Sequence, residues 1–208
     1  MKLYVISDTH IQNQFSHLEL AHFAKQAGVS YFQYREKKFV NSIHFHELVK
    51  IRELLKNSNT KLIINDDLDL ALEIQADGVH VGQEDLSLEV IFQKKLPLNF
   101  IVGATVHNEK ELKQVSQYPI HYIGMGPIFG TQSKKMSLPP LGIDGLKKLL
   151  KQTQIPVFAI GNIQFDNYKF LQFLPLEGIV LLSAFVLSEN PHQTLEQWKS
   201  KLSITEKD

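Results

Sequence analysis

The sequence predicts a single-domain (β/α)8 TIM barrel, an α/β fold, and three observations support this prediction. Short apolar runs typical of buried strands recur eight times along the 208 residues, and amphipathic stretches typical of helices separate them. Polar clusters directly follow several of these runs, which is where a parallel barrel places its active site. No low-complexity segment or linker interrupts the alternation, so we expect one barrel domain over residues 1–203 and a short charged tail over 204–208.

The first five expected strands lie in the first half of the chain. They cover residues 3–6, 31–34, 63–64, 78–81 and 100–103. The first helix is the most clearly marked, because Ser16 and Glu19 have the spacing of a capping box and Gly28 follows its last apolar residue. Ser87 and Asn108 are expected to cap the helices after the fourth and fifth strands.

Three further strands are expected in the second half of the chain. They cover residues 122–125, 157–160 and 178–182. The last helix is expected to begin with Asn190 as its cap and Pro191 in its first turn. A total of eight strands favours a closed barrel over an open doubly wound sheet.

The overall charge of the chain gives no indication of a nucleic-acid or membrane-surface partner. Lysine plus arginine and aspartate plus glutamate each number 22, which argues against nucleic-acid and membrane-surface partners. The absence of cysteine excludes disulfides, thiolate zinc sites and cysteine nucleophiles. The start of the chain lacks the features of a signal peptide, and no window approaches the ~20 apolar residues of a membrane helix. We therefore expect a soluble, cytoplasmic protein. The sequence does not determine its oligomeric state, and a homo-oligomer is possible.

Two acidic clusters follow the third and fourth expected strands, at residues 65–67 and 83–85. Because the ends of parallel barrel strands open on one face, the two acidic clusters are expected to meet there. Two carboxylates from separate loops suit Mg²⁺, whose remaining ligands can be substrate phosphates. The alternative is that these aspartates only cap helices.

A basic motif follows the second expected strand. Alternation along the strand sends Gln33, Arg35 and Lys37 to the same side. A bidentate guanidinium beside an ammonium group suits a polyphosphate. The alternative is an exposed charged strand end, in which Glu36 pairs with a neighbouring lysine.

A stretch without helical or strand period covers residues 126–142, which is long for a plain connection. It carries hydroxyl and ammonium groups on Thr131, Ser133, Lys134 and Lys135, so we expect a lid that could close over an anion. An ordinary solvated turn is the alternative.

The turns after the seventh and eighth strands, at 161–162 and 183–184, are candidates for a phosphate site made of backbone N–H groups. Gly161 alone is weak support, because such turns often need glycine for conformational reasons. His107 follows the fifth strand and could act as an acid or base near neutral pH, or could simply orient its neighbours. His44 and His46 are expected to lie on the surface, since their spacing does not place them on one helical face.

Six strings of the sequence have the order and the residues of a known enzyme family. They are YFQYREK at 31–37, INDDLDLAL at 64–72, ADGVHVGQED at 76–85, GATVHN at 103–108, YIGMGPIFGTQSKK at 122–135 and AIGNI at 159–163. With these strings the chain resembles the thiamine-phosphate synthases, also called thiamine-phosphate pyrophosphorylases. The combination of the first three strings is far more specific than any one alone.

The resemblance implies a (β/α)8 enzyme that joins hydroxymethylpyrimidine diphosphate to hydroxyethylthiazole phosphate and releases pyrophosphate. It implies that the diphosphate is held by Gln33, Arg35, Lys37, Asn65 and Lys134, of which Arg35, Lys37 and Lys134 would stabilise the leaving group. It implies Mg²⁺ on Asp66 and Asp85. It places the thiazole phosphate near Thr131, Ser133, the turn at 161–162 and Leu182–Ser183.

Four positions depart from the family pattern. Thr105 replaces the usual serine, Gly130 a proline, Ser133 a threonine, and Asn162 a second glycine. Two alternative functions stay open: the related thiazole tautomerase, with His107 as its acid–base residue, and a catalytically silent phosphate-binding barrel.

Overall fold

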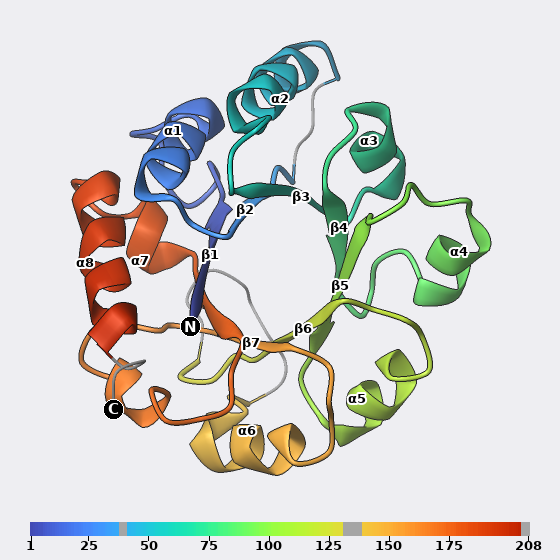
Figure 1. Cartoon of the computed structure of the whole chain (residues 1–208), viewed down its shortest axis with the longest axis vertical. Coiled ribbons are helices and arrows are strands. Elements are labelled where there is room, and N and C mark those ends of the chain that lie inside the picture. Colours follow the sequence, from blue (N-terminus) through green and yellow to red (C-terminus); the bar gives the residue numbers. More distant parts are fainter. Residues whose placement is uncertain (38–40, 131–138, 205–208) are drawn as a thin grey trace.

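The structure, a computed structural model, describes residues 1–37, 41–130 and 139–204. Eight parallel strands follow one another around a closed barrel in chain order, and the last strand pairs with the first. Helices surround the strands on the outside, as Figure 1 shows. The predicted (β/α)8 barrel is confirmed.

The strands lie within three residues of their predicted ends. They are β1 (Lys2–Ser7), β2 (Tyr31–Tyr34), β3 (Lys61–Asn65), β4 (Gly78–Val81), β5 (Ile101–Val106), β6 (Tyr122–Met125), β7 (Val157–Ile160) and β8 (Gly178–Leu181). The α-helices are α1 (His17–Ala27), α2 (Asn41–Leu55), α3 (Leu68–Glu73), α4 (Leu88–Gln93), α5 (Glu109–Val115), α6 (Gly142–Leu150), α7 (Ser183–Val186) and α8 (Pro191–Ile204). Between β7 and β8 the regular alternation is broken, because that connection contains a 3-10 turn, η1 (Tyr168–Phe170), in place of an α-helix.

The predicted helix caps are present. Ser16 Oγ accepts the Glu19 N–H at 3.2 Å while the Glu19 carboxylate accepts the Ser16 N–H at 2.8 Å, so α1 begins with a complete capping box. Gly28 ends the helix with a φ of 63°, a left-handed conformation that glycine adopts without strain. Asn108 caps α5, and Asn190 accepts the Gln193 N–H at the start of α8.

An aromatic layer fills the lower half of the barrel, nearer the amino ends of the strands. The ring centroids of Tyr4, Tyr31, Tyr122 and Phe158 lie 5.2–5.8 Å apart. Gly103 makes room for this layer, since a Cβ atom there would lie 2.1 Å from Cζ of Tyr122. The layer closes the barrel from below and leaves its carboxyl end open.

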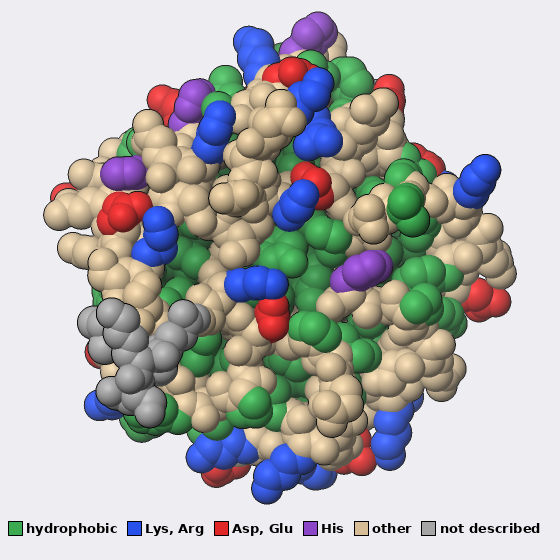
Figure 2. All heavy atoms as spheres, in the orientation of Figure 1, with side chains coloured by type: hydrophobic (Ala, Val, Ile, Leu, Met, Phe, Trp, Pro, Cys, Tyr) green, Lys and Arg blue, Asp and Glu red, His purple; other side chains and the backbone are tan. Residues whose placement is uncertain are grey.

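Surface charges of both signs are interspersed. On the face drawn in Figure 2, Lys and Arg side chains lie beside Asp and Glu side chains, and apolar side chains gather near the centre. Within the described ranges, the chain contains no helix that is both long and apolar enough to cross a membrane.

Candidate active site

A cavity opens above the aromatic layer, where the strands end. Nine of the thirteen residues predicted to bind substrate or metal line it: Gln33, Arg35, Asn65, Asp66, Asp85, Thr105, Asn162, Leu182 and Ser183. They come from six strands or from the loops that follow them. The fold therefore brings together groups that are up to 150 residues apart in the sequence.

The other four predicted site residues are placed differently. Lys37 is exposed and is not among the residues that line the cavity. Thr131, Ser133 and Lys134 lie outside the described residues, as does the whole central part of the predicted lid, residues 131–138. The roles of all four stay predictions.

Two carboxylates meet at the entrance of the cavity, as the sequence predicts. Asp66 follows β3 and Asp85 follows β4, and the two side chains lie within hydrogen-bonding reach of each other. Burial and the neighbouring Asp85 raise the pKa of Asp66 to about 7, although Asn65 and Arg35 oppose this shift. Asn65 Nδ2 donates to Asp66 Oδ2 at 2.5 Å, and the Gly82 N–H donates to Asp85 at 2.9 Å.

Such a pair suits a cation whose ligands are mainly oxygens. Within the described ranges, no group of three or more His, Asp or Glu side chains is arranged to hold a metal ion by itself. Mg²⁺ needs only one or two protein carboxylates when substrate phosphates and water complete its shell. Asp66 and Asp85 therefore fit a shared metal–diphosphate site better than a dedicated protein cage.

The helix-cap alternative applies to the neighbouring aspartate. Asp67 Oδ1 accepts the Leu70 N–H at 2.9 Å and begins α3. Asp66 is thus left free of capping, and its φ of 66° turns the chain sharply at the end of β3. The backbone N–H of Asp66 donates to the carbonyl of His80 on the next strand at 2.8 Å.

Arg35 is held at the entrance by a residue that the sequence reasoning missed. Asp8, which is 1% exposed, accepts a hydrogen bond from Arg35 Nη1 and another from the His10 N–H. Asp8 directly follows β1, so its position after a strand was the signal that could have identified it. We call Arg35, Asp66 and Asp85 the mouth of the cavity.

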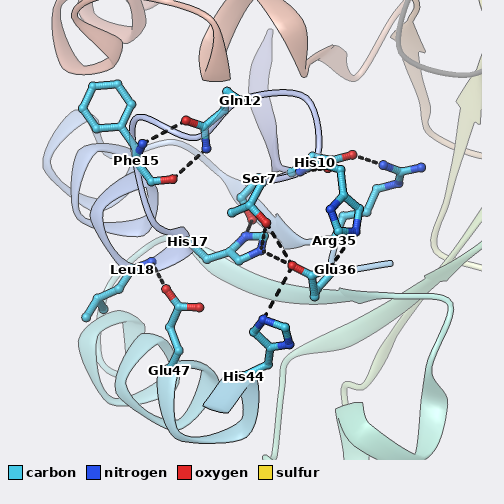
Figure 3. A network of polar contacts seen from close by, with 12 residues as sticks. Ser7, His10, Gln12, Phe15, His17, Leu18, Arg35, Glu36, His44 and Glu47 are labelled. Carbon is cyan, nitrogen blue, oxygen red and sulfur yellow. Dashed lines mark hydrogen bonds and ion pairs between the residues drawn. The ribbon is translucent and has the colours of Figure 1, made fainter. Parts of the chain in front are cut away.

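The loop after β2 is anchored through Glu36, as Figure 3 shows. Its carboxylate is 3% exposed and accepts from Thr9 Oγ1 at 2.9 Å. His10 Nε2 and His17 Nε2 lie 2.8 and 3.4 Å from it, and His44 approaches to 3.9 Å. Glu36 is therefore a structural anchor that fixes the backbone next to Arg35. Its partners include histidines, whereas the alternative considered from the sequence was an ion pair between Glu36 and a neighbouring lysine.

Beneath the mouth lies a chain of hydrogen bonds that crosses the barrel, which we call the floor. Gln33 Nε2 donates to the hydroxyl of Tyr4 at 2.6 Å, and that hydroxyl lies 2.8 Å from the hydroxyl of Tyr122. The Tyr122 hydroxyl is 3.0 Å from His80 Nδ1, and His80 Nε2 is 2.9 Å from Thr105 Oγ1. The five residues thus form one continuous line.

The groups of the floor are neutral. Burial lowers the pKa of His80 to about 4 and raises the pKa values of Tyr4 and Tyr122 above their ordinary value. The sequence reasoning missed all three residues. Strand parity was the available signal, since Tyr4, His80 and Tyr122 occupy inward positions of their strands.

The turn after β7 tolerates its departure from the family pattern. Gly161 has a φ of 112°, and a Cβ atom there would lie 2.5 Å from Cα of Pro127. Asn162 adopts a φ of 49°, a left-handed conformation that asparagine accepts more readily than most residues. Its side-chain oxygen lies 3.5 Å from Gln164 Nε2, and the short helix α7 begins directly after β8 nearby.

Two other sequence features can be placed. Gly130 has a φ of 89°, which proline cannot adopt, so the glycine found here in place of the family's proline is what this backbone requires. His107 lines the cavity, and its Nδ1 lies 2.9 Å from a carboxylate oxygen of Glu111. The same oxygen accepts the His107 backbone N–H at 2.7 Å.

Comparisons with known proteins agree on one family. The family model described as thiamine monophosphate synthase matches residues 3–185. A thiamine-phosphate synthase of Dictyoglomus turgidum is 41% identical over 168 residues, which cover 81% of this chain and 75% of the relative. One from Chloroflexus aurantiacus is 33% identical over 205 residues, covering 99% and 94%.

Solved structures give the same result. The thiamine phosphate pyrophosphorylase from Pyrococcus furiosus superposes with a TM-score of 0.86 at 28% identity, covering 98% of this chain and 96% of that one. A 3-hexulose-6-phosphate synthase, at a TM-score of 0.68 and 15% identity, shares the fold alone.

Proposed function

The chain belongs to the thiamine monophosphate synthase family, and we propose that it joins hydroxymethylpyrimidine diphosphate to hydroxyethylthiazole phosphate, releasing pyrophosphate. One observation carries this proposal beyond family membership. Arg35, Asp66 and Asp85 converge at the mouth of a single cavity whose floor is neutral and polar. A charged mouth suits a diphosphate with its metal ion, and a neutral floor suits an uncharged heterocycle.

Asp66 and Asp85 would hold Mg²⁺ at the mouth. When bound, the ion neutralises charge on the diphosphate and so makes it a better leaving group. Arg35 donates to the same group, and Asp8 keeps its guanidinium oriented. By resemblance to the family, Asn65, Lys37 and Lys134 add further donors. The resemblance implies the same role for Gln33, but the Gln33 amide nitrogen donates to Tyr4 within the floor.

The reaction exchanges one bond for another at the methylene carbon of the pyrimidine. The carbon–oxygen bond to the diphosphate breaks and its electron pair leaves with pyrophosphate. The aminopyrimidine ring can delocalise the positive charge left on the methylene carbon, and the thiazole nitrogen then forms the new carbon–nitrogen bond. No protein nucleophile is needed, so the residues of the cavity act by positioning and by electrostatic stabilisation.

The thiazole phosphate is assigned to the side of the cavity formed after β7 and β8. Support comes from Gly161, Asn162 and Ser183, whose turns adjoin the cavity and offer backbone N–H groups there. By resemblance, Thr131 and Ser133 would complete this half of the site.

A thiazole tautomerase is the second candidate, because one observation favours it. His107 faces the cavity and its ring is oriented by Glu111, an arrangement suited to moving a proton. Against it, the charged mouth that a tautomerase does not need is intact in this chain.

The deciding experiment is product formation by the purified protein. It should be supplied with pyrimidine diphosphate, thiazole phosphate and Mg²⁺, with and without a chelator. We expect thiamine phosphate and pyrophosphate in equal amounts, lost when the chelator is added. A folded protein that forms no product, but isomerises the thiazole carboxylate phosphate and loses that activity with His107→Asn, would establish the tautomerase instead.

A further inference from the structure

The first member of the floor allows its hydrogen bonds to run in one direction. An amide nitrogen can only donate, so Gln33 Nε2 gives its hydrogen to Tyr4 and the Tyr4 oxygen accepts. The Tyr4 hydrogen is then available to the Tyr122 oxygen, 2.8 Å away, and the Tyr122 hydrogen to His80 Nδ1, 3.0 Å away. A neutral imidazole that accepts at Nδ1 carries its own hydrogen at Nε2, facing Thr105.

Both ends of this chain open into the cavity. Within the described part of the protein, the Gln33 side chain makes no other hydrogen bond, so its carbonyl oxygen is available as an acceptor. When the chain runs in this direction, Thr105 Oγ1 accepts from His80, so the Thr105 hydrogen can be donated to a ligand. The cavity thus presents an acceptor on β2 and a donor on β5, three strands apart around the barrel.

The barrel is shaped to keep the His80 ring in this line. The ring stacks on Tyr122 with an interplanar angle of 22° and a centroid distance of 5.5 Å. Gly124 makes room beside it, since a Cβ atom there would lie 3.3 Å from His80 Cε1. Thr105 is β-branched and therefore stiff at χ1, which limits the directions in which its hydroxyl can point.

We propose that His80 is a positioning residue that, through Tyr122 and Thr105, fixes the hydrogen-bond polarity of the cavity floor so that it selects an aminopyrimidine. Provided the cavity binds the pyrimidine diphosphate, as proposed above, the match is direct. The exocyclic amino group of that ring is a donor, and the ring nitrogen opposite to it is an acceptor. The amino group faces Gln33 Oε1, and the opposite nitrogen faces the Thr105 hydroxyl.

The position of the proton on His80 is the first test, because it can be read without any enzyme activity. In ¹⁵N NMR spectra of the labelled full-length protein, the His80 ring is assigned by difference from His80→Gln. We expect a protonated Nε2 and an unprotonated Nδ1. A proton on Nδ1 would reverse the direction of the whole chain and overturn the proposal.

The second test separates the floor from the rest of the aromatic layer. Tyr122→Phe removes the central hydroxyl but keeps the ring, and Tyr31→Phe is the matched control in the same layer, away from the cavity lining. We expect Tyr122→Phe to raise KM for the pyrimidine diphosphate about tenfold, the value of one lost neutral hydrogen bond. KM for the thiazole phosphate and the activity of Tyr31→Phe should stay within about twofold of the wild type. Equal effects of the two variants, or an equal rise in both KM values, contradict the proposal.

The third test is rescue at position 80. His80→Gln can accept from Tyr122 and donate to Thr105, whereas His80→Leu can do neither. We expect the glutamine variant to retain kcat/KM within about threefold of the wild type and the leucine variant to lose about 30-fold. Thermal unfolding measurements identify a loss of activity that is caused by misfolding. If a position-80 variant is misfolded, the Tyr122→Phe result decides whether the proposal holds.

Failure of the synthase function would be distinguishable from failure of this proposal. The probe is the pyrimidine alcohol, which lacks the diphosphate. If no product forms but the alcohol shifts the His80 ¹⁵N signals and binds about tenfold more weakly to Tyr122→Phe, the polarity of the floor is supported and the proposed reaction is not. If product forms but the alcohol binds both proteins equally, the reaction stands and the role of His80 is refuted.

Discussion

The mouth of the cavity carries charges on Arg35, Asp66 and Asp85, whereas its floor is a line of neutral groups that ends at Gln33 and Thr105. The pKa shifts differ in the same way. Burial and a neighbouring carboxylate raise the pKa of Asp66 to about 7, and a cation would relieve the repulsion between the two carboxylates. No such ion is required at the floor, where each of the five side chains already has a hydrogen-bond partner inside the barrel. The two regions are thus suited to the two halves of one substrate.

The largest expected effect comes from removing charge at the mouth. Asp66→Asn should lower Mg²⁺-dependent turnover roughly 1,000-fold, because a metal–diphosphate interaction that stabilises the leaving group is lost. Asp69→Asn is the matched control, since Asp69 is exposed and pairs with Lys94 on the surface. Steady-state rates over a range of Mg²⁺ concentrations measure both variants. A rate for Asp66→Asn close to that of the control would exclude Asp66 as a metal ligand.

A smaller effect is expected at Asp8, which orients Arg35 but is not itself part of the mouth. Asp8→Asn weakens the charged hydrogen bond that orients Arg35, so KM for the pyrimidine diphosphate should rise about 30-fold. Asp77→Asn is the matched control. Asp77 Oδ2 lies 3.5 Å from Arg52 Nη1 at the opposite end of the barrel, so this variant should leave KM unchanged. An equal change in both variants would mean that the Asp8 effect is one of stability.

The floor is expected to respond to pH in the unfolding equilibrium. The unfolded imidazole of His80 takes up a proton near 6.5 and the folded one only near 4, so the unfolded state binds more protons between these values. Stability should therefore fall as pH is lowered from 6.5 to 4. His80 should contribute on the order of 2 kcal/mol to this loss of stability. This is less than the full pKa difference would give, because the cavity leaves part of the ring open to solvent. His80→Gln should lose this part of the slope in denaturant titrations, and identical slopes in both proteins would show that the ring is charged in the fold.

The smallest effect is expected at the side of the cavity assigned to the thiazole phosphate. Asn162→Gly keeps a left-handed backbone that is already present and removes a side chain where the family has glycine, so KM for the thiazole phosphate should fall about two- to threefold. Asn57→Gly is the control, because Asn57 has a similar φ of 63° outside the cavity lining. A rise in KM specific to Asn162→Gly would mean that the asparagine side chain helps to hold the phosphate.

The sequence predicted the fold and the mouth because their signals are local. Apolar runs, capping residues and polar clusters after strands are all visible within a few positions, and barrel geometry then brings Arg35, Asp66 and Asp85 together. The floor left only the alternation along its strands, which places side chains inside the barrel but does not show which of them meet. Tyr4 and Tyr122 are 118 positions apart, and nothing near either shows that their hydroxyl groups meet. Asp8 did have a local signal, its position directly after β1, but the sequence does not show that its partner is Arg35, 27 positions away.

The most direct test of the division between mouth and floor is calorimetric binding of two ligands to two variants. Pyrophosphate with Mg²⁺ reaches only the mouth, whereas a non-hydrolysable analogue of the pyrimidine diphosphate with Mg²⁺ reaches both regions. We predict that Tyr122→Phe binds pyrophosphate like the wild type but the analogue about tenfold more weakly, and that Asp66→Asn weakens both ligands. Equal weakening of both ligands by Tyr122→Phe, or of neither, would contradict the division of the cavity into a charged mouth and a floor that reads the ring.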